Sequence, residues 1–229
     1  MTCPDSVDEH HLGSGSPPAP APEEAVPVYL APYRTEIERS GAGFSATLWG
    51  SRDAQRRRFD VMLALLPMHE RRVVDLGCGE GDLLSHLLER GVTPSAYVGL
   101  DAMAPMLEKA RERGLPGARF EVADLLQDDA AITSASPDVA CISGTLNTME
   151  PADARTIVAR AFDAARLGVV FNFLSDRPHR RWADRPLGPA RRFDTLEWLD
   201  WALRRSSRVR FDQSYLDGHD ATIAILRDA

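Results

Sequence analysis

Three groups of residues that could bind a ligand follow strand-like runs of the sequence. The glycine-rich stretch Gly77–Gly81 follows RVVDL, Asp101 follows AYVGL, and Asp124 follows ARFEV by one residue. The carboxyl ends of parallel strands meet at one edge of a sheet, where ligands bind. Glycine allows a tight turn and a close approach of the ligand to the backbone, and a carboxylate can accept hydrogen bonds from both ribose hydroxyls. Asp124 can accept a hydrogen bond from an adenine amino group, so together these residues predict a site for an adenosine compound.

The glycine spacing separates two classes of nucleotide ligand. A dinucleotide fingerprint is G-x-G-x-x-G and directs the next helix at a pyrophosphate. Here the glycines alternate, as GCGEG, and Glu80 and Asp82 lie at the start of the next helix. Two carboxylates at this position would repel a pyrophosphate but would attract a cation. We therefore expect an adenosine compound that carries a positively charged amino group or sulfonium.

The elements that position these residues alternate between strand and helix, which predicts βαβ units and a mostly parallel sheet in an α/β fold. Strand-like runs cover residues 72–76, 96–100, 118–122, 138–142 and 168–173, and helical patterns cover 51–68, 81–90, 103–113 and 152–166. After these, a helix over 194–205 leads to two strands, 209–215 and 221–226. The short link between the last two strands predicts an antiparallel hairpin.

Composition limits the class of protein and predicts its domain organisation. Residues 1–27 are rich in Pro and Ala and predict a disordered tail, whereas 28–229 are expected to form a single domain with an N-terminal helical lid over 28–70. The sequence has no apolar run of about 20 residues that would span a bilayer, and its first residues do not resemble a secretory signal. The three cysteines are widely spaced and form neither a disulfide framework nor a zinc pattern, so no metal is expected and the cytoplasm is the predicted compartment. The net charge of −7 disfavours a dedicated nucleic-acid binder.

Taken together, VVDLGCGEGD, VGLD and the position of Asp124 resemble the class I S-adenosylmethionine-dependent methyltransferases of bacterial small-molecule type. The resemblance covers about residues 50 to 226. It implies a Rossmann-like, doubly wound sheet of seven strands in the order 3-2-1-4-5-7-6, with strand 7 antiparallel and helices on both faces. It also implies S-adenosyl-L-methionine as cofactor and S-adenosyl-L-homocysteine as product.

The resemblance further implies which residues of the core, 71–229, bind the cofactor. Asp75 anchors the glycine loop near the amino group of the methionine moiety, Asp101 holds the ribose, and Asp124 meets the edge of the base. FSATLWGSRDAQRRRF is similar to the leader of some family members and adds two more positions. The implied cofactor-binding residues are Gln55, Arg58, Asp75, Gly77, Cys78, Gly79, Asp101, Ala102, Met103, Asp124, Leu125, Ser143 and Gly144.

Several residues are candidates for contact with the methyl acceptor, each with a structural alternative. Asn147 follows the fourth strand, where it either contacts the substrate and assists catalysis or forms a turn. Tyr33 and Trp49 precede the sheet and either enclose the reacting centre or pack in the core. His179 and His219 are candidate bases or structural histidines, and methyl transfer from a sulfonium needs little acid catalysis.

The segment Arg177–Arg192 holds six arginines and one acid, and either recruits an anionic substrate, beginning with Arg177, or forms a solvated loop. A carboxylate acceptor would suit these arginines and would need no base. The position after the fourth strand reads SGTLNTM and lacks D/N-P-P-Y/F, which disfavours methylation of amino groups on bases or glutamine.

We therefore expect a monomeric or homodimeric enzyme that methylates a small-molecule acceptor on O or N in a bacterial biosynthetic pathway. No membrane partner is expected. Two alternatives stay open: a nucleic-acid or protein methyltransferase that docks its target through Arg177–Arg192, or a domain that binds the cofactor without transferring methyl.

Overall fold

The computed structural model describes residues 27–228, in which seven strands form one sheet. The order is β3-β2-β1-β4-β5-β7-β6, and β7 pairs antiparallel with both β5 and β6. The strands are β1 (Arg72–Leu76), β2 (Ala96–Asp101), β3 (Ala118–Val122), β4 (Val139–Ile142), β5 (Gly168–Leu174), β6 (Val209–Asp212) and β7 (Asp220–Leu226). The expected α/β fold, strand order and terminal hairpin are confirmed. The predicted tail lies outside the described residues except for Pro27.

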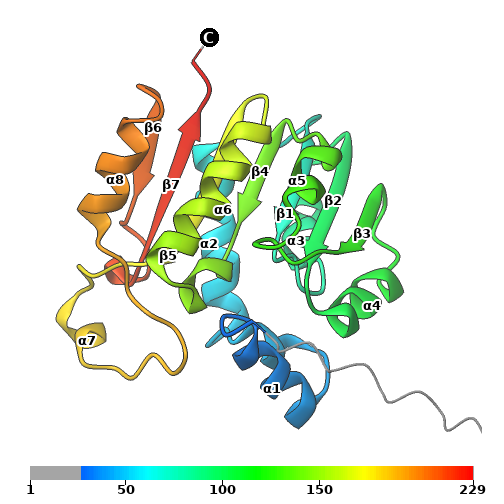
Figure 1. Cartoon of the computed structure of the whole chain (residues 1–229), viewed down its shortest axis with the longest axis horizontal. Helices are drawn as coiled ribbons and strands as arrows, with labels where there is room; N and C mark the ends of the chain where they lie inside the picture. Colours follow the sequence, from blue (N-terminus) through cyan, green and yellow to red (C-terminus); the bar gives the residue numbers. More distant parts are fainter. Residues whose placement is uncertain (1–26, 229) are drawn as a thin grey trace, which may run out of the picture.

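Helices cover both faces of the sheet, as Figure 1 shows, and each face has its own apolar core. One core contains side chains of α2 (Arg52–Leu65), α3 (Asp82–Glu89) and α4 (Ala104–Glu112). The other contains side chains of α5 (Asp129–Ala135), α6 (Pro151–Ala164) and α8 (Thr195–Leu203). β5 and β7 are buried along their whole length, as strands covered on both faces must be.

Two predicted elements end earlier in the structure than expected, and one helix was not predicted. The helix predicted over 51–68 ends at Leu65, because Pro67 disfavours a helical conformation at Leu66, which is extended with φ −142° and ψ 115°. The strand predicted over 209–215 ends at Asp212, and a 3₁₀ helix, η3 (Leu216–Gly218), follows it. The helix α5 was not predicted, because its sequence DAAITSA shows no wide apolar stripe.

Several short elements gather beyond the carboxyl ends of the parallel strands. Figure 1 shows α1 (Ala31–Ser40) and α7 (Arg180–Ala183) at this end of the sheet. The 3₁₀ helix η1 (Phe44–Thr47) joins α1 to the start of α2, where the Ser51 hydroxyl accepts a hydrogen bond from the Ala54 N–H at 3.2 Å. α2 packs on the sheet through Met62, whereas the lid function predicted for 28–70 stays a prediction.

None of the helices described over residues 27–228 is long and apolar enough to cross a membrane.

Candidate active site

The loop after β1 is shaped by its glycines. Gly77, Gly79 and Gly81 have φ values of 77°, 53° and 76°, in the left-handed region that favours glycine. A Cβ atom at Gly77 would lie 2.1 Å from the Thr145 hydroxyl oxygen, so this loop is in close contact with the 3₁₀ helix η2 (Thr145–Thr148). The Thr145 hydroxyl also donates to the Leu76 carbonyl at 2.9 Å. The loops after β1 and β4 therefore hold one another in place.

Asp101, at the end of β2, joins the first loop to the second. Its carboxylate accepts hydrogen bonds from the Gly79 and Met103 N–H groups, both at 2.8 Å. Burial raises the pKa of Asp101, and the two N–H donors partly oppose that rise. An ionised carboxylate has about four acceptor positions, so positions remain for the two hydroxyls of a ribose.

Asp75 lies one residue before the end of β1 and is 3% exposed. The Tyr97 hydroxyl of β2 donates to its Oδ2 at 2.5 Å. Burial raises the pKa of Asp75 to about 7, the Tyr97 bond opposes this rise, and the charges of Asp101 and Asp82 add to it. A cation placed beside Asp75 would favour its ionised form.

The loop after β4 is fastened by Asn172 of β5. Its side-chain oxygen accepts from the Gly144 N–H at 3.0 Å, and its amide nitrogen donates to the Ser143 hydroxyl at 2.8 Å. A Cβ atom at Gly144 would lie 2.4 Å from the Trp49 ring, which rests against this glycine. Sequence reasoning missed Asn172, although a lone polar residue in the apolar run GVVFNF is a signal, because buried polar groups need partners.

These loops border a cavity that is open to solvent and encloses about 830 Å³ when the open space at its mouth is included. Eleven predicted cofactor-binding residues line it, namely Gln55, Asp75, Gly77, Cys78, Gly79, Asp101, Ala102, Met103, Leu125, Ser143 and Gly144. Asp82, which was not predicted to contact the ligand, also lines it and accepts from the Gln55 amide at 3.1 Å. Among the described residues that line this first cavity there are three aspartates and no Arg, Lys or His.

Two predicted cofactor-binding residues lie outside the first cavity. The Arg58 guanidinium makes two hydrogen bonds of 2.6 Å to the carboxylate of Asp220 and lies 4.3 Å from the centroid of the Trp49 ring. Asp124 accepts from the Tyr29 hydroxyl at 2.5 Å and from the Leu126 N–H at 2.9 Å. The structure thus places both residues in contacts within the protein, and their predicted roles toward the cofactor stay predictions.

A second cavity, of about 880 Å³, adjoins the first. The two share Tyr33, Thr47, Trp49 and Gly144 as lining residues, and the predicted role of Tyr33 and Trp49 in enclosing the reacting centre stays a prediction. Arg58 and Arg185 line the second cavity, and none of its lining residues in the described chain is Asp or Glu. The charged side chains of the first cavity are therefore acidic and those of the second are basic, although Asp82 is paired with Arg113 and Arg58 with Asp220.

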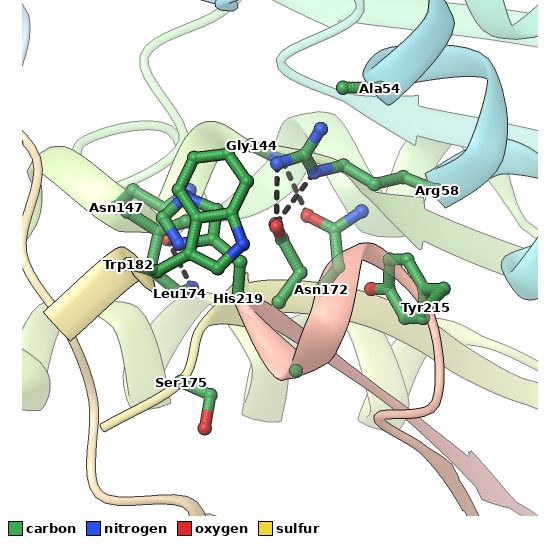
Figure 2. Close-up of polar contacts among 12 residues, drawn as sticks. Ala54, Arg58, Gly144, Asn147, Asn172, Leu174, Ser175, Trp182, Tyr215 and His219 are labelled. Carbon is green, nitrogen blue, oxygen red and sulfur yellow. Dashed lines mark hydrogen bonds and ion pairs between the residues drawn. The ribbon is translucent and has the colours of Figure 1, made fainter. Parts of the chain in front are cut away.

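Asn147 and His219 both line the second cavity, and Figure 2 shows them beside Trp182. The Asn147 side-chain oxygen accepts from the Leu174 N–H at 3.0 Å. The Arg192 guanidinium lies 3.2 Å from Nδ1 of His219, and the Trp182 ring stacks on the imidazole at a centroid distance of 4.4 Å. Burial, followed by the charge of Arg192, lowers the pKa of His219 to about 4.

Arg177 and His179 line neither cavity. Nδ1 of His179 accepts from the Arg181 N–H at 3.3 Å and caps α7. Arg177 lies 3.8 Å from Asp176.

Most other arginines of Arg177–Arg192 also have partners within the fold. Arg181 pairs with Asp217, and Arg191 makes two bonds to Glu150. Arg192 donates to the Ser175 and Trp182 carbonyls at 2.7 and 2.8 Å. This segment therefore folds back over the sheet edge and forms part of the wall of the second cavity.

No group of three or more His, Cys, Asp or Glu residues within 27–228 is arranged to hold a metal ion.

Comparison with known proteins agrees with this geometry. Residues 73–168 match a family model described as a methyltransferase domain. Trans-aconitate 2-methyltransferase of Variovorax paradoxus is 34% identical over 163 residues, which cover 63% of this chain and 59% of that protein. The protein of the same name from Rhizobium etli is 45% identical over 74 residues, 32% of this chain and 28% of that protein. The chain thus spans less than two thirds of the length of these relatives.

Among solved structures, magnesium protoporphyrin IX methyltransferase from Synechocystis with bound SAM aligns with a TM-score of 0.64 at 14% identity, covering 90% of this chain and all of that one. At this identity the likeness concerns the fold alone. The matched domain, the strand order and the glycine loop that meets Asp101 at the sheet edge agree with one another. These findings support the resemblance to the class I S-adenosylmethionine-dependent methyltransferases, and the matched methyltransferase domain covers residues 73–168.

Proposed function

We propose that this protein transfers the methyl group of S-adenosylmethionine to a small-molecule acceptor that carries a carboxylate. The observation that supports the proposal is the pair of adjoining cavities, one lined by three aspartates and the other by Arg185, for which no ion pair is found among the described residues. Opposite charges in neighbouring sites suit a cationic methyl donor beside an anionic acceptor.

The first cavity fits the cofactor chemically. S-adenosylmethionine carries an ammonium and a sulfonium, and Asp75, Asp82 and Asp101 are the charged groups that line this cavity. Asp101 would hold the ribose, Asp75 would face the ammonium, and the glycine backbone would contact the methionine moiety. The bare backbone at Gly77 and Gly79 supports this assignment, because both glycines have positive φ and a Cβ atom at Gly77 would strike Thr145.

The second cavity would hold the acceptor. Its shared wall with the first cavity, formed in part by Trp49 and Gly144, is where the methyl group and its acceptor would meet. Arg185 stacks on Trp182 at 4.5 Å and has no ion-pair partner among the described residues, so its charge is available to an anion. The curated relatives are named for trans-aconitate, which is itself a carboxylate.

The chemistry demands little of the protein beyond positioning. When bound, S-adenosylmethionine supplies a methyl group on a sulfonium that is already an activated leaving group. The walls of the two cavities would align the acceptor oxygen with the methyl group and exclude water. Such alignment is worth about 7–11 kcal/mol of the barrier in well-oriented systems.

No observation favours docking of nucleic acid or protein through Arg177–Arg192, since Arg181, Arg191 and Arg192 have partners within the fold. The other alternative, a domain that binds the cofactor without transferring methyl, is distinguished from an enzyme by the labelling assay described next.

The test has two stages. Calorimetry with S-adenosylhomocysteine measures cofactor binding, and no detectable heat would refute the proposal at once. Protein is then incubated with methyl-labelled cofactor and, separately, with trans-aconitate, other small di- and tricarboxylates, phenols, amines and an RNA oligomer. We expect base-labile labelled ester with at least one carboxylate. Label found only in the phenol, amine or RNA reactions would refute the carboxylate acceptor, and binding without label in any reaction would favour a non-transferring domain.

A further inference from the structure

We infer that His219 is a hydrogen-bond donor that orients the acceptor, and that it does not act as a general base. This inference rests on the proposed function, because it concerns the same second cavity. It assigns a specific proton to a specific nitrogen, and that assignment can be measured without any acceptor.

The contact with Arg192 determines which imidazole nitrogen carries the proton. A guanidinium has only donors, so Nδ1 of His219, 3.2 Å from the Arg192 Nη2, must present its lone pair. The Arg192 side chain is held in place, since it also donates to the Ser175 and Trp182 carbonyls. The neutral ring therefore carries its proton on Nε2.

The environment also disfavours a second proton on the ring. Burial, together with the charges of Arg192 and Arg185 from the segment after β5 and of Arg58 from α2, lowers the pKa of His219 to about 4. Of the neighbouring carboxylates, Asp217 is paired with Arg181, and Asp220 is paired with Arg58, whose own charge it partly compensates. The ring is therefore neutral across the physiological range of pH.

The other ring nitrogen of His219, Nε2, belongs to a residue that lines the second cavity. No hydrogen bond to Nε2 of His219 is found among the described residues. The stacked Trp182 ring, inclined by 26°, fixes the plane in which the Nε2–H lies. This geometry presents a directed donor to whatever occupies the cavity.

Asn147 presents a second donor to the same cavity. Its Oδ1 is occupied by the Leu174 N–H, which leaves the amide NH₂ as its free group. Tyr33 is not an effective base, because burial raises its pKa to about 12 and keeps the phenol protonated. With donors on its wall and no Asp, Glu, Lys or Cys among its described lining residues, the cavity suits an acceptor oxygen that arrives already ionised. A carboxylate meets that requirement at neutral pH, whereas an alcohol or phenol does not.

The first experiment is NMR of the full chain with ¹⁵N-labelled histidine, in which long-range ¹H–¹⁵N spectra identify the tautomer of each ring. The His219 signals are assigned by their loss in His219→Gln. We expect a protonated Nε2, an unprotonated Nδ1 and no titration between pH 5.5 and 8. A proton on Nδ1, or a midpoint near 6.5, would overturn the inference, whatever the outcome of the cofactor-binding test.

The second experiment separates a donor from a base by substitution. With S-adenosylhomocysteine bound, the Kd for trans-aconitate is measured for His219→Ala, for His219→Gln, whose amide retains a donor near the position of Nε2, and for a control, His69→Ala. His69 is exposed and lines neither cavity.

We expect binding about 10- to 100-fold weaker in His219→Ala, near-normal binding in His219→Gln and no change in the control. In turnover with S-adenosylmethionine, His219→Gln is expected to retain kcat. Loss of kcat in His219→Gln with unchanged Kd would identify a base and contradict the inference. Equal binding by all variants, with the fold intact, would also contradict it.

Discussion

Replacing Asp101 by Asn tests the proposed cofactor site most directly. The substitution keeps the shape of the side chain but removes its charge and turns one acceptor oxygen into a donor. Both carboxylate oxygens already accept a backbone N–H, from Gly79 and Met103 at 2.8 Å. The new NH₂ group would therefore face a backbone donor as well as a ribose hydroxyl.

The expected magnitude follows from the bonds that change. A hydrogen bond to a charged group contributes about 1.5–3 kcal/mol, and a neutral one about 0.5–1.5 kcal/mol. Loss of one ribose bond and weakening of the other together cost about 2–4 kcal/mol of binding free energy. That corresponds to a Kd for S-adenosylhomocysteine that is about 30- to 1,000-fold higher.

The assay is calorimetry with S-adenosylhomocysteine, paired with a matched control. Asp138 also accepts a hydrogen bond from a backbone N–H, that of Arg72 at 2.9 Å. It lies just before the first residue of β4, at the amino ends of the parallel strands and therefore away from the candidate site. Asp138→Asn should therefore bind normally even if the fold loses some stability. An unchanged Kd in a folded Asp101→Asn protein would refute the ribose role of Asp101.

Three further predictions test the surrounding structure. Gly144→Ala places a methyl group 2.4 Å from the Trp49 ring at φ +80°, so kcat/KM for methyl transfer should fall about tenfold or more, and unchanged kinetics would show that the ring position does not matter. Asp75 has a pKa raised to about 7 against 3.8 when unfolded, so the folded state binds the extra proton and the unliganded protein should lose stability as pH rises from about 4 to 8. Urea unfolding should show this loss, on the order of 4 kcal/mol, in the wild type but not in Asp75→Asn. Arg58→Met leaves Asp220 buried and unpaired and should cost about 3–5 kcal/mol in urea unfolding, most of it recovered when Asp220→Leu is added, whereas no cost would indicate that the pair is not formed.

The parallel part of the fold was predictable because its signals are local. A run such as AYVGL followed by Asp101 shows both a buried strand and a polar residue at its carboxyl end. The rule that such ends share one edge of a sheet then brings Asp101 to the glycine loop without any knowledge of the tertiary structure. The end of α2 at Leu65 was also predictable from a local signal, because Pro67 disfavours a helical conformation at Leu66, but the predicted helix ran past it.

The acceptor side was not predictable in the same way. His219 and Arg192 are 27 residues apart, and the tautomer of His219 depends on that contact. No periodicity or motif in the sequence indicates that the segment after β5 folds back onto the start of β7. The choice between base and donor therefore required the structure.

The sequence by itself determined three features: the glycine turn after the first strand, the carboxylate at the end of the second strand, and the antiparallel pair of strands at the end of the sheet. Each of them is encoded within a few neighbouring residues. Only the tertiary structure decided that Arg58 pairs with Asp220, 162 residues away, and that Asp124 bonds to Tyr29, 95 residues away. The physical reason is that a charged side chain can satisfy its charge with any partner that folding brings near. Which partner that is depends on how loops close over the sheet, and not on the residues beside it in the chain.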